Sequence, residues 1–311
     1  MQFLFILPAL FVFVQAVIAA SRTSPPSGAV VVRAGTTASG EFKSIQAAVN
    51  SFPNDGSTRS IFIYPGTYTE KVYITRKGAL TIYGYTTDTS TYTQNQATIS
   101  FNSGLDQSSS NDETGTLRIH TDNFKMYNVN VKNTRGPGTQ AGALSQYGNR
   151  AGFYGCAFYG YQDTLYANQG TQVYLKGYIE GKTDFIYGRQ GLAYFGGNTI
   201  AVKGPGYITA SGRQSDDAGS YVFNANTVIQ ASGAESGTSG GYYFGRPWSL
   251  SCFYSFRCPP RPITFTESFS RTLIFKSLRT RRFGSSGTGT PTVSHMCYTQ
   301  TTRLLELAPV V

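Results

Sequence analysis

The sequence predicts a single all-β domain built as a right-handed parallel β-helix. Three observations indicate this fold class: short strand-forming segments follow one another along the chain, the middle of the chain repeats with a period of about 22 residues, and charge is sparse. Charged residues make up 14% of the 311 residues, whereas Gly occurs 35 times, Tyr 22 times and Phe 21 times. This composition is typical of extracellular β proteins, and many of these handle sugars.

The strand signals are short, rich in β-branched and aromatic residues, and separated by Gly, Asn, Asp and Thr. After a first one near Val30 they comprise residues 61–64, 72–74, 80–83, 117–119 and 129–131. One segment breaks the pattern: Phe42–Val49 is predicted to be helical, with Phe42, Ile45 and Val49 on one face. We expect this helix to cover an open end of the β stack.

The repeat is clearest in the middle of the chain. Residues 158–166 (FYGYQDTLY) align with residues 179–187 (IEGKTDFIY) at an offset of 21, with Gly, Asp and Tyr coinciding. One period upstream, residues 138–140 (GTQ) align with residues 160–162 (GYQ) at an offset of 22. Short β segments repeating every 20 to 25 residues predict one coil of a β-helix per repeat.

The repeat places four polar residues in one column. Equivalent positions on successive coils stack about 4.8 Å apart, so Gln140, Gln162, Asp163 and Asp184 should form a ladder on one face. Two carboxyl groups this close cannot both ionise readily, and one pKa should rise. An acid beside a base is what the hydrolysis of an ester requires.

Four segments of the chain then resemble a known family. In order, they match the signature segments of the pectin methylesterases, in the form typical of secreted fungal enzymes: residues 66–70 (GTYTE), 160–166 (GYQDTLY), 184–188 (DFIYG) and 245–248 (GRPW). Gln140 lies in the expected stretch before the second segment. The resemblance runs from about Val30 to Trp248, and it implies a pectin-lyase-like solenoid that removes methyl esters from polygalacturonate with release of methanol and without a metal or other cofactor.

The resemblance also implies roles for single residues. Asp184 matches the nucleophile, and Asp163 matches the general acid that protonates the leaving methoxide and later acts as base. The side chains of Gln140 and Gln162 match the donors that stabilise the oxyanion. Arg246 matches the arginine that keeps the nucleophile ionised and oriented.

Other residues of the matched segments have binding or structural interpretations. Trp248, the only Trp in the chain, matches an aromatic that packs on the sugar. Tyr161 and Tyr187 either line the substrate groove or stack inside the coils. Gly66, Tyr68 and Glu70 are expected to be structural. The substrate implied is a methyl-esterified pectin polymer, bound by a monomer.

Two other functions remain open from the residues alone. A different β-helical pectin-degrading enzyme is one of them, but a lyase needs several acidic side chains around Ca²⁺. A polygalacturonase needs clustered Asp residues with a His, and the only Asp pair, Asp216–Asp217, has no His near it in sequence. The second alternative is a non-catalytic carbohydrate-binding β-helix, which the presence of Asp163 and Asp184 argues against.

The N-terminus predicts secretion. Residues 3–19 carry no charge and end in small residues, which is typical of a cleaved signal peptide over residues 1–20 and of an extracellular protein with no membrane anchor. The four cysteines form no C-x-x-C pair and only His120 and His295 are present, which argues against a zinc site and a Ser-His-Asp hydrolase. How Cys252, Cys258 and Cys297 pair is left open.

Residues 251–311 differ from the catalytic domain predicted over residues 21–250. This tail carries eight of the Lys and Arg residues against two Glu, so it holds +6 of the net charge of +10, and a nucleic-acid partner is not predicted from the remainder. The coil pattern stops, and residues 258–262 (CPPRP) suit no β-helix coil. Reading Ser294–Ala308 from the third base of each codon permits a string that resembles the family's usual ending. The tail is therefore interpreted as a shifted reading frame.

Overall fold

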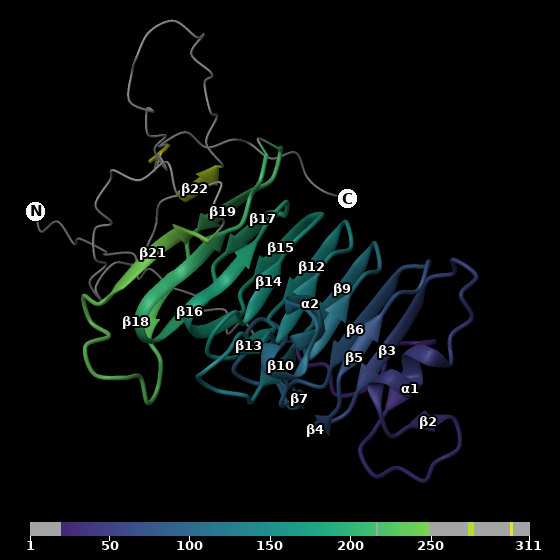
Figure 1. Ribbon diagram of the computed structural model, residues 1–311. Coiled ribbons are helices and arrows are strands. Elements are labelled where there is room, and N and C mark those ends of the chain that lie inside the picture. The colour runs from purple at the N-terminus through teal and green to yellow at the C-terminus, as the bar shows by residue number, and fades with distance from the viewer. Residues whose placement is uncertain (1–19, 216, 249–272, 277–298, 301–311) are drawn as a thin grey trace, which may run out of the picture.

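The computed structural model describes residues 20–215, 217–248, 273–276 and 299–300. Within these residues the chain winds repeatedly around one axis, and the strands of successive coils pair in parallel. Figure 1 shows the coils stacked from the N-terminal end, in purple, to β21, in light green. The predicted parallel β-helix is confirmed.

Each coil contributes strands to three faces of the β-helix. The first face holds β1 (Val30–Val32), β3 (Arg59–Ile63), β6 (Leu80–Gly84), β9 (Phe124–Tyr127), β12 (Ala151–Tyr154), β15 (Thr171–Leu175), β17 (Leu192–Gly196) and β19 (Ser220–Asn224), with β2 (Glu41–Phe42) beside β1. The second face holds β4 (Gly66–Thr69), β7 (Ala97–Phe101), β10 (Val129–Asn133), β13 (Ala157–Tyr159) and β20 (Thr227–Gln230). The third face holds β5 (Val72–Ile74), β8 (Leu117–Ile119), β11 (Leu144–Gln146), β14 (Leu165–Ala167) and β21 (Tyr242–Pro247).

Two long strands belong to both the second and the third face. β16 (Tyr178–Gly188) and β18 (Thr199–Ser211) run without a break through the corner that other coils turn with a loop. Their pairing shifts register between Gly181 and Ile186, which is where the corner lies. The second and third faces are therefore continuous at these two coils.

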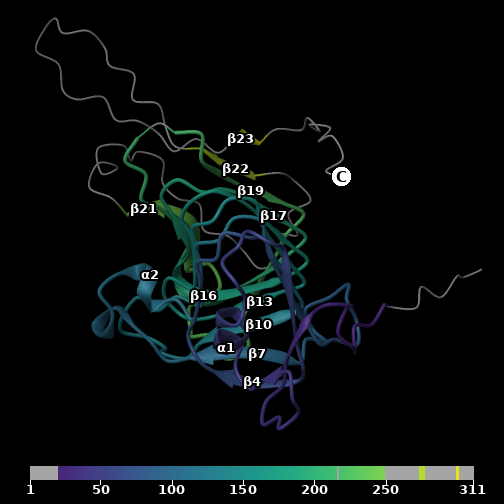
Figure 2. The same ribbon diagram turned by 90° about the vertical axis from the view of Figure 1, so that its right-hand side faces the viewer.

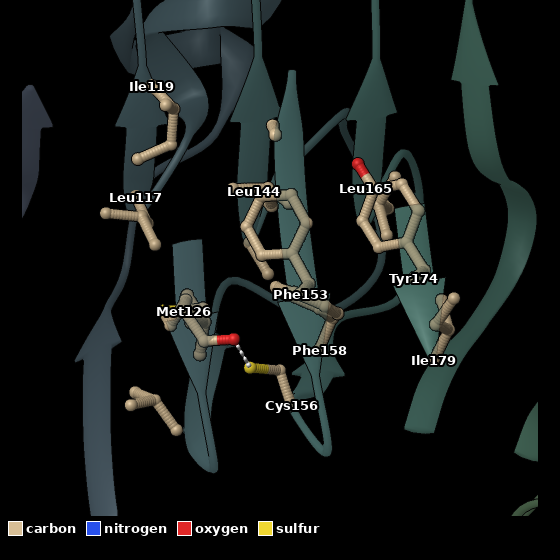
Figure 3. Packing of buried hydrophobic residues seen from close by; sticks show 14 of the residues in the cluster. Leu117, Ile119, Met126, Leu144, Phe153, Cys156, Phe158, Leu165, Tyr174 and Ile179 are labelled. Atoms are coloured by element: carbon tan, nitrogen blue, oxygen red, sulfur yellow. Dashed lines mark hydrogen bonds between the residues drawn. The ribbon is translucent and has the colours of Figure 1, made fainter. Parts of the chain in front are cut away.

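The core is a set of columns of identical or similar side chains. Leu117, Leu144 and Leu165 occupy the same register position on three successive coils and are fully buried (Figure 3). The rings of Phe153, Tyr174 and Phe195 stack in the same way, with centroids 4.8 and 4.7 Å apart. Burial of such apolar columns contributes about 25 cal/mol per Å² and holds successive coils in register.

A short helix closes the N-terminal end of the stack. α1 (Ile45–Asn50) lies across the first coil (Figure 2), with Ile45, Ala48 and Val49 buried against the core. Ser44 caps it by accepting a hydrogen bond from the Ala47 N–H. The predicted helix was placed too early, because Phe42 lies in β2 and packs on the core from there.

Glu70 has a structural contact that agrees with its expected role. Its Oε1 and Oε2 accept hydrogen bonds from the backbone N–H groups of Ile45 and Gln46, at 2.7 and 2.9 Å. These donors have no partner within the helix, so a carboxylate at this end satisfies them and the helix dipole together. The residue thus ties α1 to the second face.

The predicted signal segment and most of the predicted tail lie outside the described residues. Two short strands of the tail are described: β22 (Leu273–Lys276) pairs antiparallel with β19, and β23 (Thr299–Gln300) pairs antiparallel with β22. No helix within the described ranges has the length and apolar character needed to cross a bilayer.

Candidate active site

The two predicted carboxyl groups lie on adjacent coils, at the corner between the second and third faces. Gln162 and Thr183, on adjacent coils, form an isolated parallel β-bridge. The Asp163 N–H donates a hydrogen bond to the Thr183 carbonyl at 3.0 Å. The Ala141 N–H donates in the same way to the Gln162 carbonyl at 3.1 Å. Gln140 and Gln162 therefore occupy equivalent places on two coils, and Asp163 and Asp184 do so on two coils.

Both aspartates adopt a backbone conformation that few side chains tolerate. The φ angle is +62° at Asp163 and +52° at Asp184, in the left-handed region. Asp and Asn enter this region more readily than other non-Gly residues, and such strain concentrates at functional sites. The repeated left-handed turn gives the two carboxyl groups the same orientation on successive coils.

A pocket of about 240 Å³ opens at this corner. It is lined by Asn111, Gln140, Gln162, Asp163, Asp184, Tyr187, Arg246 and Trp248. Seven of the eight residues predicted for the site line it. The eighth, Tyr161, does not: its hydroxyl donates to Glu235, which also pairs with Lys182 at 2.7 Å.

Arg246 reaches Asp184 from β21. Its Nε donates to Oδ1 and its Nη2 to Oδ2, both at 2.8 Å. The guanidinium also lies 4.7 Å from the centroid of the Tyr207 ring, which fixes its plane. These hydrogen bonds raise the pKa of Arg246, and the two-point pair fixes the orientation of the Asp184 carboxyl group.

Asp163 has the opposite environment. Only 6% of its surface is exposed, and no Lys or Arg among the described residues forms an ion pair with it. Burial first, and then the negative charge of Asp184, raise the pKa of Asp163 well above its ordinary value. The Arg246 charge and the nearby Tyr187 hydroxyl lower this pKa, but by less. The pocket thus holds a carboxyl group paired with an arginine beside a buried one whose pKa is raised.

The two amide side chains are available to a ligand. Within the described part of the chain, neither the Gln140 nor the Gln162 Nε2 donates a hydrogen bond to protein; Gln140 Oε1 accepts one from Thr139. Both line the pocket beside the carboxyl groups. Such free N–H donors suit an oxygen atom that gains negative charge during a reaction.

The aromatic wall of the pocket is formed by Trp248 and Tyr187. Their rings meet edge to face with centroids 5.3 Å apart, and Tyr187 stacks on Tyr166 at 4.4 Å. Tyr187 is almost fully buried, whereas Trp248 is half-buried. A Cβ atom at Gly212 would lie 2.7 Å from the Trp248 ring, so the absence of a side chain there lets the indole seat itself.

Asn111 lines the pocket but was not predicted. It starts α2 (Asn111–Thr114), which Ser110 caps by accepting from the Glu113 N–H. The next residue, Asp112, anchors this turn by accepting hydrogen bonds from Arg118 and Ser145 and pairing with His120. A four-residue helix is too short to show a periodic signal in the sequence.

The fold and the pocket together are those of a β-helical hydrolase with paired carboxyl groups. Comparison with known proteins gives its family: the Pectinesterase family model matches residues 29–255. The chain belongs to the pectinesterase family and is a carboxylic ester hydrolase that acts on the methyl esters of pectin. This membership decides against the lyase, the polygalacturonase and the non-catalytic alternatives.

Similar proteins come mainly from fungi. The chain is 43% identical over 230 residues to a probable pectinesterase A from Neosartorya fischeri, covering 74% of this chain and 69% of the relative. It is 40% identical over 289 residues to a pectinesterase from Aspergillus niger, and the match covers 89% of this chain and 86% of the relative.

Solved structures agree with the sequence relatives. A crystal structure of the pectin methylesterase from Aspergillus niger matches with a TM-score of 0.70 at 41% identity, covering 74% of this chain and 75% of that one. Pectin methylesterase from carrot matches with a TM-score of 0.63 at 26% identity, covering 74% and 72%. A pectin methylesterase solved in complex with a hexasaccharide matches with a TM-score of 0.61 at 25% identity. The match covers 76% of this chain and 75% of that one.

Proposed function

We propose that Asp184 is the nucleophile of this esterase and Asp163 its general acid and base. The supporting observation is the difference between the two carboxyl groups: Asp184 is paired at two points with Arg246, whereas burial and the charge of Asp184 raise the pKa of Asp163. Ester hydrolysis needs both forms at once, one to attack and one to protonate the leaving group.

The reaction follows from these states. An Asp184 oxygen attacks the carbonyl carbon of the methyl ester, and the resulting oxyanion accepts hydrogen bonds from Gln140 and Gln162. The tetrahedral intermediate collapses, methoxide leaves with the Asp163 proton as methanol, and an anhydride joins the substrate to Asp184. Asp163, now a carboxylate, takes a proton from water; the hydroxide attacks the anhydride and releases Asp184 and a galacturonate carboxyl group.

The substrate side of the site is proposed from the aromatic wall. Trp248 is exposed enough to pack against a sugar ring, and a solved relative holds a hexasaccharide, which supports a polymeric substrate. Tyr187 is proposed to act through its hydroxyl at the pocket rather than through its buried ring. Tyr161, held by Glu235, is proposed to bound the groove one step away from the reacting ester.

The enzyme is also proposed to be an extracellular monomer. The charge-free segment 3–19 supports removal of residues 1–20 during secretion. N-terminal sequencing of the protein recovered from the culture medium should then begin at Ser21. A protein retained in the cells with Met1 at its start would contradict this proposal.

Methanol release from methylated pectin tests the catalytic assignment. Asp184→Asn keeps the size of the side chain and its tolerance of the left-handed turn but removes the charge, so turnover should fall by at least about 10³. Asp122→Asn, at an exposed carboxylate outside the pocket, should leave turnover unchanged. Wild-type turnover in a correctly folded Asp184→Asn protein would show that Asp184 is not the nucleophile.

A further inference from the structure

A second groove lies at the other edge of the second face. It has a volume of about 570 Å³ and is lined mainly by Arg22, Tyr127, Tyr154, Lys176, Tyr194 and Asn224, which together we name the tyrosine groove. These residues lie at the turns from the first to the second face, whereas the catalytic pocket lies at the turns from the second to the third. Gly155 and Gln162, at the two corners of one coil, are seven positions apart in sequence, which corresponds to roughly 20 Å of extended strand.

Stacked tyrosine rings form one side of the groove. Tyr127 and Tyr154 line the groove from successive coils, with ring centroids 4.8 Å apart, and Tyr83, outside the lining, extends the stack at 5.3 Å from Tyr127; the ring planes lie within about 15° of parallel. The Arg22 guanidinium lies over this stack, 5.0 Å from the Tyr83 centroid and 5.4 Å from that of Tyr127. The surface combines apolar ring area with hydroxyl groups and a cation, as carbohydrate-binding surfaces do.

The cation is held in place rather than free to move. Arg22 Nη1 donates to Asn128 Oδ1 at 3.1 Å, and Asn128 Nδ2 donates to the Thr91 carbonyl at 3.0 Å. Asn128 is 1% exposed, so one buried side chain fixes both the arginine and the loop that forms the opposite wall. This arrangement orients a charged donor before any ligand arrives.

The charge of the groove is of one sign. Lys176 is exposed and makes no ion pair within the described part of the chain, and its backbone N–H donates to the Gly196 carbonyl at 3.0 Å. No Asp or Glu lines the groove. The nearby loop carries Asp88, but that carboxylate accepts hydrogen bonds from the N–H and hydroxyl of Ser90, at 2.8 and 2.6 Å.

We propose that the tyrosine groove is a second carbohydrate site, which binds the anionic, demethylated galacturonate stretch of the polymer. Its ligand rests on the proposed function, because demethylated galacturonate is the product of that reaction. Arg22 and Lys176 can form ion pairs with the free carboxylates of the product, but not with an uncharged methyl ester. The catalytic pocket, with its two carboxyl groups, has the opposite preference. The groove would therefore hold the enzyme on polymer that it has already processed.

Binding of a fully de-esterified galacturonate oligomer tests the proposal, because this probe cannot be turned over. In a Trp248→Ala background, which weakens the catalytic site, titration calorimetry should still show binding that falls with added salt. Lys176→Glu in the same background should weaken that binding at least about fivefold, since it replaces an attractive contact by a repulsive one. Lys77→Glu, an exposed lysine at the N-terminal end of the stack, is the matched control and should leave it unchanged.

Three results would overturn the proposal: no binding in the Trp248→Ala background, equal losses in Lys176→Glu and Lys77→Glu, or equal binding of de-esterified and fully methylated oligomers by a Trp248→Ala protein that also carries Asp184→Asn and so hardly turns the methylated oligomer over. Arg22→Gln provides a second variant, with an expected loss of the same order. If the wild-type chain releases no methanol yet binds the de-esterified oligomer through Lys176, the proposed reaction fails while the groove remains a galacturonate site.

Discussion

Arg246 and Asp184 lie 62 positions apart in the chain, yet their side chains join at two points, each 2.8 Å long. The pair links the coil that carries the proposed nucleophile to β21, at the far end of the described β-helix. It fixes the plane of the Asp184 carboxyl group. The reactive geometry therefore depends on the C-terminal coils being folded.

Arg246→Lys should separate geometry from charge. Lysine keeps the positive charge but cannot donate from two parallel N–H groups, so Asp184 would keep a cationic neighbour and lose its orientation. We expect kcat on methylated pectin to fall about 10- to 100-fold with little change in KM. Arg150→Lys, at an exposed arginine that does not line the pocket, is a suitable control. Equal kinetics for Arg246→Lys and the wild type would mean that charge alone suffices.

Asp163 should make both activity and stability depend on pH. Because its pKa is raised in the folded state, turnover should fall as pH rises through that pKa and the general acid is lost. For stability, ionising a buried Asp163 destabilises the fold, so its favourable contribution is complete below the unfolded pKa of about 4 and is lost as pH rises toward the folded value.

The corresponding measurement compares Asp163→Asn with the wild type by urea unfolding from about pH 3 to pH 8. The variant should gain stability relative to the wild type as pH rises. Asp55→Asn should show the opposite trend, confined to acid pH, because hydrogen bonds from Ser57 lower the pKa of Asp55. A flat difference for Asp163→Asn would show that the pKa of Asp163 is not raised.

Gln162→Ala should lower kcat by roughly 10²–10³ while leaving KM nearly unchanged, because the amide acts on the oxyanion and not on the bound ester. Gln140→Ala should behave alike, since the two occupy equivalent places on adjacent coils. The exposed Gln190, outside the pocket, gives a matched Gln→Ala control. A loss confined to KM would assign the amides to substrate binding instead.

Trp248→Ala should affect the polymer more than a small ester. Removing the indole takes away a surface for the neighbouring sugar rings, so KM for pectin should rise about tenfold while turnover of a monomeric methyl ester changes little. Tyr85→Ala, remote from the pocket, should alter neither. Equal losses on both substrates would place Trp248 in support of the reacting groups rather than of the polymer.

Residues 251–311 are proposed to result from a shifted reading frame, and sequencing the transcript tests this. The match to the Aspergillus niger pectinesterase covers 89% of the chain, which is more than residues 1–250 can supply, so part of the tail aligns with this relative and counts against a frame shift over its whole length. We expect the transcript to restore the family's ending and the expressed 311-residue chain to be less stable than the restored one. A transcript that encodes this tail, with full activity, would refute the proposal.

The sequence predicted the β-helix and the column of polar residues because both depend on the coil period. The offset of 21 or 22 residues can be read from the amino-acid sequence. It aligns Asp163 with Asp184 without knowledge of the coil that connects them. Asn111 and the tyrosine groove escaped detection for the same reason. Asn111 comes from an irregular loop and Arg22 from an N-terminal segment, and both lie outside the repeat; the tyrosines of the groove do recur from coil to coil, but the pattern does not show that Arg22 lies over them.

The start of α1 was misplaced because Phe42 fits the helical pattern of apolar residues as well as Ile45 does. Ser44 decides the boundary, since its hydroxyl caps the helix and its backbone is extended. The spacing of apolar residues shows which side chains face the core. The first residue of the helix depends instead on the hydrogen bond between Ser44 and the Ala47 N–H, which that spacing does not show.

Asp163 and Asp184 both occupy left-handed turns, so the number of residues in one coil sets the position of one carboxyl group relative to the other. Twenty residues lie between the two carboxyl groups, and inserting or deleting one of them would turn the following side chains to the opposite side of the strand. Natural variants of this enzyme should accordingly tolerate length changes in the irregular loop between β7 and β8, and not between residues 164 and 183. The number of residues between Asp163 and Asp184 is therefore under selection for catalysis, whichever residues occupy these positions.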